Sequence, residues 1–299
     1  MLRTGVCGVG HLGRFHVNCL KELGGLVGVY DPDQAAAASA DVPVFSSYAD
    51  LLDAVDAVVI AAPTPRHVDC AREALTRGKH VLIEKPVAPT AAEGASLRAL
   101  AAGSTVHVGH IERFNPAYTA ALPHLLDARH ITAQRLAPFT PRGAEVSVVH
   151  DLMIHDLDAL LAVRDREVVG LEAWGERVVS DTLDVAHVRL AFSDGCRAVL
   201  TASRVSPVRV RSWEAWGTGG GVYVDFAART AARWTPEGPV DLPVGAQNAL
   251  LEELRSFLAA AAGQPLAAGV RPAALEDGLR ALGLADHITA SIAAPTFAS

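Results

Sequence analysis

Apolar residues in the first third of the chain follow two alternating periods. Short apolar runs, typical of buried parallel strands, occur at Leu2–Cys7, Leu26–Tyr30, Val42–Phe45, Ala57–Ala61, His80–Ile83 and Thr105–Val108. Between them, apolar residues at helical spacing predict helices over His11–Leu23, Pro32–Ala40, Ser47–Ala54, His67–Arg77 and Thr90–Ala101. Strands that alternate with helices in this way predict an α/β domain with a doubly wound parallel sheet.

The pattern changes near His110. Long strand-like runs separated by turn signals are found at Arg129–Leu136, Glu167–Trp174, Asp184–Phe192, Cys196–Ser203, Val208–Trp216 and Val222–Phe226. Helices are predicted over Asn115–Leu125, Val149–Val163, Asn248–Ala261 and Pro272–Ile292. We therefore expect a second, α+β domain with a mostly antiparallel sheet. The boundary is expected at a hinge near Gly109–Phe114, which gives domains of residues 1–112 and 113–299.

Three glycines follow the first predicted strand, and their spacing is G-x-G-x-x-G. Gly8 permits a tight turn, Gly10 lets a pyrophosphate approach the backbone, and Gly13 lets the following helix pack closely against the strand. The start of that helix presents free N–H groups and a positive dipole end to phosphates. The pattern predicts a Rossmann-type dinucleotide-binding domain, and the alternative is a glycine-rich structural turn.

An acidic residue ends the second predicted strand, about twenty residues beyond the glycines. We expect this residue, Asp31, to accept hydrogen bonds from both hydroxyls of an adenosine ribose. Its negative charge disfavours a 2′-phosphate, and no Arg or Lys follows in Pro32–Gln34. The expected cofactor is therefore NAD rather than NADP.

Composition narrows the class of protein. The chain has 299 residues, half of them hydrophobic, which is enough for two domains with their own cores. A net charge of −7 argues against nucleic-acid partners and anionic membrane surfaces. The four cysteines form no C-x-x-C pair and lie mostly in apolar runs, as expected of buried thiols in a reducing compartment. With no signal peptide and no run long enough to span a bilayer, we expect a cytoplasmic protein with no membrane partner.

A second candidate site is Glu84-Lys85-Pro86, at the carboxyl end of a predicted parallel strand. Open α/β sheets bind their ligands at that edge. The ammonium of Lys85 could donate to a substrate hydroxyl and stabilise the alkoxide that forms as hydride leaves. Pro86 restricts Lys85 to extended geometry, and a cis bond is possible. The alternative is a solvated lysine in a loop.

A third candidate site lies in the predicted helix after His150. Asp151 and His155 stand at i and i+4, hence on one helix face, and Asp158 lies one turn further on. A carboxylate beside an imidazole fixes its tautomer and raises its basicity, as a general base requires. Acidic residues are also common at ordinary helix N-termini. A metal site is not expected, because His150 and His155 point away from each other and no further ligand has suitable spacing.

Together these motifs resemble the Gfo/Idh/MocA family of NAD(P)-dependent oxidoreductases over essentially the full chain. The matching residues are Gly8-Val9-Gly10-His11-Leu12-Gly13 with His16, Thr64-Pro65 with His67, Glu84-Lys85-Pro86, and Asp151, His155 and Asp158. The resemblance implies that Lys85 and His155 are the catalytic pair and that Asp151 holds the imidazole. It also implies cofactor contacts from the glycine turn (with His11 and Leu12), Asp31, Thr64, Pro65, His67, Glu84 and Lys85.

A finer resemblance concerns the substrate. The segments Val108–Pro116 and Asp151–Asp156 are similar to the UDP-N-acetylglucosamine 3-dehydrogenase branch. Arg113 and Asn115 would then face the domain cleft and bind sugar hydroxyls or a phosphate together with Asp151 and His155. The alternatives for these two residues are a hinge salt bridge and a helix N-cap.

The expected function is oxidation of a secondary hydroxyl of a sugar nucleotide, with hydride transfer to NAD. The small-molecule substrate would be UDP-N-acetylglucosamine, oxidised at C3. Two alternatives stay open: a dehydrogenase of a free sugar, sugar phosphate or inositol, and a non-catalytic NAD-binding sensor. The resemblance also implies a homo-dimer or tetramer.

Overall fold

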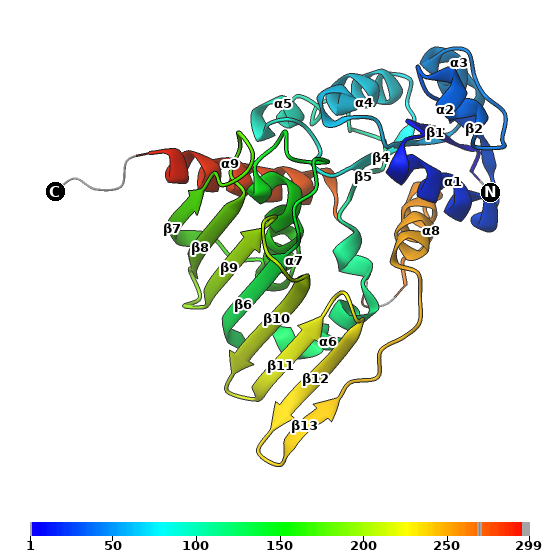
Figure 1. Ribbon diagram of the computed structural model, residues 1–299. Coiled ribbons are helices and arrows are strands. Elements are labelled where there is room, and N and C mark those ends of the chain that lie inside the picture. The colour runs from blue at the N-terminus through cyan, green and yellow to red at the C-terminus, as the bar shows by residue number, and fades with distance from the viewer. Residues whose placement is uncertain (1, 268, 270, 295–299) are drawn as a thin grey trace. The chain divides into compact units, whose positions relative to one another are not determined.

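The computed structural model describes residues 2–267, 269 and 271–294 (Figure 1). The chain forms two compact units, each built from two segments: Met1–Phe114 with Gln247–Leu279, and Asn115–Ala246 with Arg280–Ser299. The first junction lies two residues beyond the expected boundary at residue 112. The segment 247–279 was expected in the second domain, but it packs with the first unit.

The first unit contains a five-stranded parallel sheet in the order β2-β1-β3-β4-β5. Its strands are β1 (Thr4–Cys7), β2 (Leu26–Tyr30), β3 (Ala57–Ile60), β4 (His80–Glu84) and β5 (Val106–Gly109). Its helices are α1 (His11–Leu23), α2 (Gln34–Ala38), α3 (Tyr48–Ala54), α4 (His67–Thr76), α5 (Ala91–Ala95) and α8 (Ala249–Ala261). The predicted Rossmann-type parallel sheet is confirmed.

Side chains of this sheet alternate between two covered faces, as the doubly wound architecture requires. Val6, Val59 and Leu82 pack with residues of α1 and α8 in one apolar cluster. On the other face, Gly5 approaches the side chain of Leu51 from α3 closely, and a methyl group at Gly5 would lie 2.7 Å from it. The apolar stripe of α8 therefore completes the core of the first unit.

Some predicted elements of this unit are shorter than expected, among them the helix predicted over Pro32–Ala40, which spans only Gln34–Ala38. Val42–Phe45 is no strand and contributes only one bridge, from Val44 to Val29. The predicted helix Thr90–Ala101 is α-helical only to Ala95, although Thr90 caps its start and accepts the N–H of Glu93 through Oγ1. Beyond Ala95, most hydrogen bonds connect residues three apart, as in a tighter 3₁₀ turn.

The second unit contains an eight-stranded sheet in the order β13-β12-β11-β10-β6-β9-β8-β7 (Figure 1). Its strands are β6 (Ala128–Leu136), β7 (Val168–Glu176), β8 (Val185–Phe192), β9 (Arg197–Ser203), β10 (Val210–Gly217), β11 (Gly220–Asp225), β12 (Thr230–Thr235) and β13 (Gly238–Asp241). Only β6 and β9 pair in parallel, so the predicted mostly antiparallel sheet is confirmed. The hairpin β12–β13 was not predicted, although Gly238 marks its turn with a φ of +118°.

Helices α6 (Pro116–Leu125), α7 (Ile154–Arg164) and the Arg280–Ala293 part of α9 (Leu275–Ala293) belong to the second unit. Tyr118 of α6 packs edge-on against Trp213, which is 1% exposed on the covered face of β10. Trp216, three residues along the same strand, is 45% exposed on the opposite face. Within the described residues, no helix is long and apolar enough to cross a membrane.

Candidate active site

The glycine turn joins β1 to α1, and its three glycines occupy different environments. Gly8 has a φ of +94°, and a methyl group there would lie 2.6 Å from the backbone nitrogen of Ala62. A methyl group at Gly13 would overlap the carbonyl oxygen of Gly8, so the helix packs directly on the turn. Around Gly10, by contrast, a methyl group would meet no atom within 4 Å. The open side of the turn is thus the side expected to receive the pyrophosphate.

Two further features suit this turn to a dinucleotide. The first turn of α1 carries no acidic residue and no side-chain cap, so its N–H groups stay available to phosphate oxygens. At the end of β2, Asp31 Oδ2 accepts the N–H of Val9 at 2.7 Å, and Oδ1 accepts the N–H of Asp33 at 2.9 Å. Asp31 is half-exposed, and each carboxylate oxygen retains a lone pair for a ribose hydroxyl. These residues fit NAD.

The other residues expected at the cofactor lie around the same sheet edge. His11 begins α1, is exposed, and meets the ring of Phe15 edge-on, whereas Leu12 is half-buried. Thr64 and Pro65 form a 3₁₀ turn, Thr64–Arg66, after β3.

Glu84-Lys85-Pro86 follows at the carboxyl end of β4. Lys85 is half-buried, and the Lys85–Pro86 peptide bond is cis, the geometry that the sequence had left open. Because β3 alone separates β1 from β4, the lysine lies two strand spacings, about 10 Å, from the glycine-turn strand. Lys85, which follows β4, therefore lies at the same edge of the sheet as the glycine turn, which follows β1.

His67, the first residue of α4, is 1% exposed and uses both ring nitrogens on backbone carbonyls. Nδ1 lies 2.8 Å from Pro86 O, and Nε2 lies 2.8 Å from Ala62 O. Burial lowers the pKa of His67, while the two carbonyl contacts favour its protonated form. These contacts leave the ring no nitrogen with which to bind a cofactor directly. Its two contacts connect the segment after β3 with the segment after β4.

In the second unit, the helix that carries His155 is anchored to the sheet by the next residue. Asp156 is buried and accepts two hydrogen bonds from Arg135, with Nε at 2.7 Å and Nη2 at 3.0 Å. Trp213 Nε1 donates to the same carboxylate at 2.9 Å. Leu157, Leu160 and Leu161 of the same helix are buried in the core. His155 itself is half-buried, on a helix held both by apolar packing and by a buried ion pair.

The helix before His155 differs from the expected continuous α-helix. Val149–Met153 forms a π-helical turn, and α7 begins only at Ile154. The expected α-helix over Val149–Val163 is therefore wrong in its first turn, because the wider π turn accommodates one extra residue. His150 in this turn contacts Asp286 of α9, with 2.8 Å between Nε2 and Oδ1. In the described part of the chain, no three metal-ligating side chains gather as a metal site would require.

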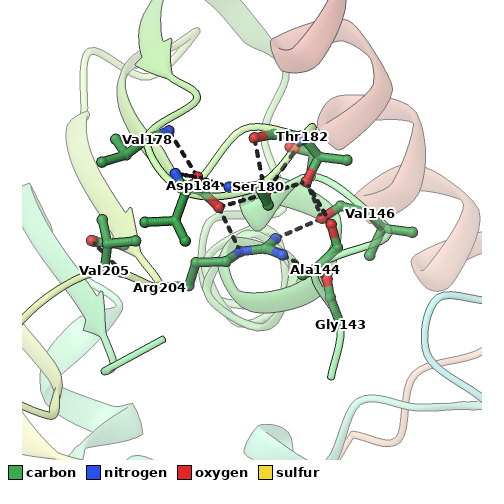
Figure 2. Close-up of polar contacts among 12 residues, drawn as sticks. Gly143, Ala144, Val146, Val178, Ser180, Thr182, Asp184, Arg204 and Val205 are labelled. Atoms are coloured by element: carbon green, nitrogen blue, oxygen red, sulfur yellow. Dashed lines mark hydrogen bonds and ion pairs between the residues drawn. The ribbon is translucent and has the colours of Figure 1, made fainter. Parts of the chain in front are cut away.

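The carboxylate of Asp151 lies directly against the loop that leads into the π turn. A methyl group at Gly143 would be 2.6 Å from Asp151 Oδ2. This loop is held by Arg204, which donates to the carbonyls of Gly143 at 2.7 Å and Val146 at 2.6 Å (Figure 2). Thr182 Oγ1 reaches Val146 O and Ala144 O, each at 3.0 Å. The backbone beside Asp151 is therefore fixed by side chains distant in sequence.

Asp184 also belongs to this network and contacts Arg204 (Figure 2). Its Oδ2 accepts the N–H groups of Val178, Val179 and Ser180, and its Oδ1 lies 3.8 Å from Arg204 Nε. Burial raises the pKa of Asp184, but hydrogen bonds from Ser180 and the backbone outweigh it and hold that pKa well below its usual range. Sequence analysis missed both residues as positioning groups. The polar residues Ser180-Asp181-Thr182, two positions before Asp184, were the available signal.

Arg113 and Asn115 take the two structural roles that the sequence left as alternatives. Arg113 is 3% exposed; its Nη1 lies 3.3 Å from Arg271 O and 3.5 Å from Asp277 Oδ2. Asn115 caps α6 by accepting the N–H of Ala117 at 3.1 Å, and it donates to Phe226 O at 3.1 Å. Asp158 is buried in α7.

Comparisons with known proteins agree with this architecture. Residues 2–110 match the model of an oxidoreductase family with an NAD-binding Rossmann fold, GFO_IDH_MocA, and residues 124–223 match the C-terminal domain of the same family. A UDP-N-acetylglucosamine 3-dehydrogenase of Acidithiobacillus ferrooxidans is 40% identical over 215 residues, which cover 68% of this chain and 67% of that protein.

A solved structure of a UDP-N-acetylglucosamine 3-dehydrogenase from the same organism superposes with a TM-score of 0.90 at 34% identity. It covers 97% of each chain. A scyllo-inositol 2-dehydrogenase (NAD⁺) of Bacillus subtilis is 29% identical over 256 residues, covering 75% of this chain and 73% of that one.

Proposed function

Because the chain belongs to the Gfo/Idh/MocA family of oxidoreductases, we propose that it oxidises a secondary hydroxyl of UDP-N-acetylglucosamine at C3. The chain is an NAD-dependent dehydrogenase that acts on CH–OH groups. The main structural support for oxidation of a hydroxyl beside NAD is the position of Lys85. It stands at the carboxyl end of β4, on the edge where the glycine turn and Asp31 are prepared for NAD.

The roles of the binding residues follow from their geometry. The N–H groups at the start of α1 would hold the pyrophosphate beside Gly10, and Asp31 would accept the ribose hydroxyls. Its carboxylate is already oriented by Val9 and Asp33. When bound, NAD supplies the acceptor for the hydride that leaves the carbinol carbon.

The proposed chemistry at the substrate uses two side chains on one hydroxyl. His155 removes the hydroxyl proton as general base. The ammonium of Lys85 donates to the same oxygen and stabilises the negative charge that develops there. Asp151 is proposed to orient the imidazole. The π turn sets the backbone of Asp151, and Arg204 holds the loop that lies against its carboxylate.

The choice of substrate is supported by the relative with the highest identity given above. A UDP-N-acetylglucosamine 3-dehydrogenase shares 40% of aligned residues, against 29% for the scyllo-inositol enzyme. The buried contacts of Arg113 and Asn115 do not support the expected direct binding of a phosphate by these two residues.

The test is a substrate panel followed through the absorbance of reduced cofactor. UDP-N-acetylglucosamine and UDP-glucose form a matched pair that differs at the acetamido group. Free N-acetylglucosamine, its 1-phosphate, myo-inositol and scyllo-inositol complete the panel. The proposal predicts that UDP-N-acetylglucosamine has the highest kcat/KM.

A second candidate, inositol oxidation, is favoured by the identity with the scyllo-inositol enzyme. It predicts turnover of an inositol at least equal to that of any UDP-sugar. Binding of NAD with no turnover of any compound would instead support the non-catalytic sensor.

A further inference from the structure

Lys85 is flanked on both sides by residues whose polar groups contact a buried histidine. On the N-terminal side, His16 of α1 places Nε2 2.6 Å from Glu84 Oε1. On the C-terminal side, His67 of α4 places Nδ1 2.8 Å from Pro86 O. The exposed fractions of the two histidines are 0% and 1%. Neither ring can exchange these contacts for water without local rearrangement.

The contact with Glu84 restrains the start of this tripeptide. Glu84 is 7% exposed, and a carboxylate that is removed from water must be compensated by donors or positive charge. Besides His16, the backbone N–H of Lys85 donates to Glu84 Oε2 at 3.2 Å. A methyl group at Gly109 of β5 would lie 2.8 Å from that oxygen. The carboxylate therefore has little freedom, and it is bonded to the backbone of the proposed catalytic lysine.

The contact with Pro86 restrains the other end. His67 Nε2 reaches Ala62 O at 2.8 Å, so one ring connects the loop after β3 with the loop after β4. Ala62 is also the residue against which Gly8 packs. The same imidazole thus fixes Pro86 relative to the dinucleotide turn. Serine or alanine at position 67 could not span both carbonyls.

We propose that His16 and His67 are positioning residues for Lys85. They hold Glu84 and Pro86 from opposite sides, so that the main chain from which the ammonium projects keeps one conformation relative to the glycine turn. This inference rests on the proposed function for its catalytic consequence. The positioning itself is a property of the first unit and can be measured without any substrate.

The sequence makes that measurement direct, because the chain contains only three lysines: Lys21, Lys79 and Lys85. Lys21 lies on α1, five residues after His16, but its ammonium donates to Ala40 O at 2.9 Å. The ammonium of Lys79 donates to Val55 O at 2.8 Å, so each of these two groups is held by a carbonyl outside Glu84-Lys85-Pro86. Trace acetylation of the full-length protein with acetic anhydride, read by peptide mass spectrometry, reports the reactivity of each amine separately. Lys21 and Lys79 are internal controls in every sample.

The variants are His16→Phe and His67→Phe, which keep an aromatic ring but remove the hydrogen bonds, and His16→Gln and His67→Gln, which retain a donor. We expect each Phe variant to change the acetylation rate of Lys85 by about threefold or more, because the rate depends on the surroundings of the amine. Lys21 and Lys79 should not respond. The Gln variants should return the Lys85 rate toward that of the unmodified protein.

Activity provides the second readout. Each Phe variant should lower kcat by about 100-fold with KM for NAD changed less than about threefold, and the Gln variants should restore part of kcat. Combined with Lys85→Ala, His67→Phe should cause no further loss of kcat, because residues that act through one another are not additive.

The inference is overturned if the Lys85 acetylation rate is unchanged in folded Phe variants, or if His67→Phe lowers kcat equally with and without Lys85. If His16→Phe does not fold, Gly109→Ala tests the same restraint by pressing on the Glu84 carboxylate. It should change the Lys85 rate, and an unchanged rate would again contradict the inference. Absence of turnover in the unmodified protein would remove the proposed function but leave the acetylation result standing.

Discussion

His16 Nε2 and Glu84 Oε1 lie 2.6 Å apart in the interior of the first unit, although 67 residues separate them in the chain. One residue belongs to the helix that follows the glycine turn, and the other precedes Lys85. The contact therefore connects the dinucleotide-binding helix with the proposed catalytic lysine. Cofactor binding by α1 and the proposed catalysis by Lys85 are thus linked through hydrogen bonds to the same glutamate, Glu84.

The glycine turn predicts opposite results for two substitutions of the same type. Gly13→Ala should destabilise the protein by about 3 kcal/mol or more, because its methyl group would overlap the carbonyl of Gly8. Gly10→Ala should leave the unfolding temperature almost unchanged but raise the Kd for NAD about tenfold or more, since the methyl group enters the phosphate space. Thermal unfolding and NAD titration separate the two effects. Equal loss of stability in both variants would contradict this account.

Asp31 should control the choice of cofactor. Asp31→Ala removes the acceptor for the ribose hydroxyls and a charge that repels a 2′-phosphate. We expect kcat/KM for NAD to fall about tenfold or more, and the preference for NAD over NADP to shrink. Asp33→Asn is the matched control, because it removes one charge nearby and retains a side chain that can cap α2. If both variants keep the original NAD preference, Asp31 is not the discriminating residue.

Arg135 and Asp156 anchor the His155 helix, and the pair is buried, with both side chains 4% exposed. Arg135→Met should lower the free energy of unfolding by about 3–5 kcal/mol, because Asp156 would stay buried without its cation. Arg189→Met breaks a pair whose side chains are 60% and 65% exposed, and it should cost less than about 1 kcal/mol. Urea unfolding measures both. Similar losses of free energy of unfolding in the two variants would show that the Arg135–Asp156 pair contributes little to stability.

Stability should depend on the titration of His107. Burial, with a smaller contribution from Arg113, lowers the pKa of His107 to about 4, while Asp277 opposes the shift. The unfolded chain binds this proton more readily than the folded protein does. The free energy of unfolding therefore keeps its maximal contribution from His107 above the unfolded pKa, and it falls as the pH drops from about 6.5 towards 4. At pH 5, His107 lowers the free energy of unfolding by about 2 kcal/mol relative to high pH.

The variant His107→Phe, which keeps an aromatic contact with Phe257, should lose this part of the pH dependence. The exposed His130 provides the control, and His130→Gln should leave the dependence unchanged. The measurement is urea unfolding at pH 8 and pH 5. An identical pH dependence in His107→Phe and the unmodified protein would contradict the assignment.

Local patterns were sufficient to predict the elements that position the cofactor. The spacing of Gly8, Gly10 and Gly13 corresponds to a positive φ, an open side and a close helix contact in the structure. Asp31 could be placed because strand ends are marked by the end of an apolar run. These properties depend on neighbours within one strand–turn–helix unit.

Contacts between distant segments could not be predicted in the same way. Nothing local in Arg204, which follows the predicted strand Cys196–Ser203, indicates that it holds the loop beside Asp151. The apolar stripe of α8 predicts a buried face but not which domain it covers. The π turn at Val149–Met153 has no distinguishing residue pattern.

The most direct test of the proposed chemistry is the turnover of Lys85→Ala, His155→Ala and the double variant with UDP-N-acetylglucosamine, measured together with the Kd for NAD. Each single variant should lose about 1000-fold in kcat, and the double variant little more, while the Kd for NAD changes less than about threefold. Near-normal kcat in either single variant that still binds NAD would contradict the assignment of Lys85 and His155 to one substrate hydroxyl.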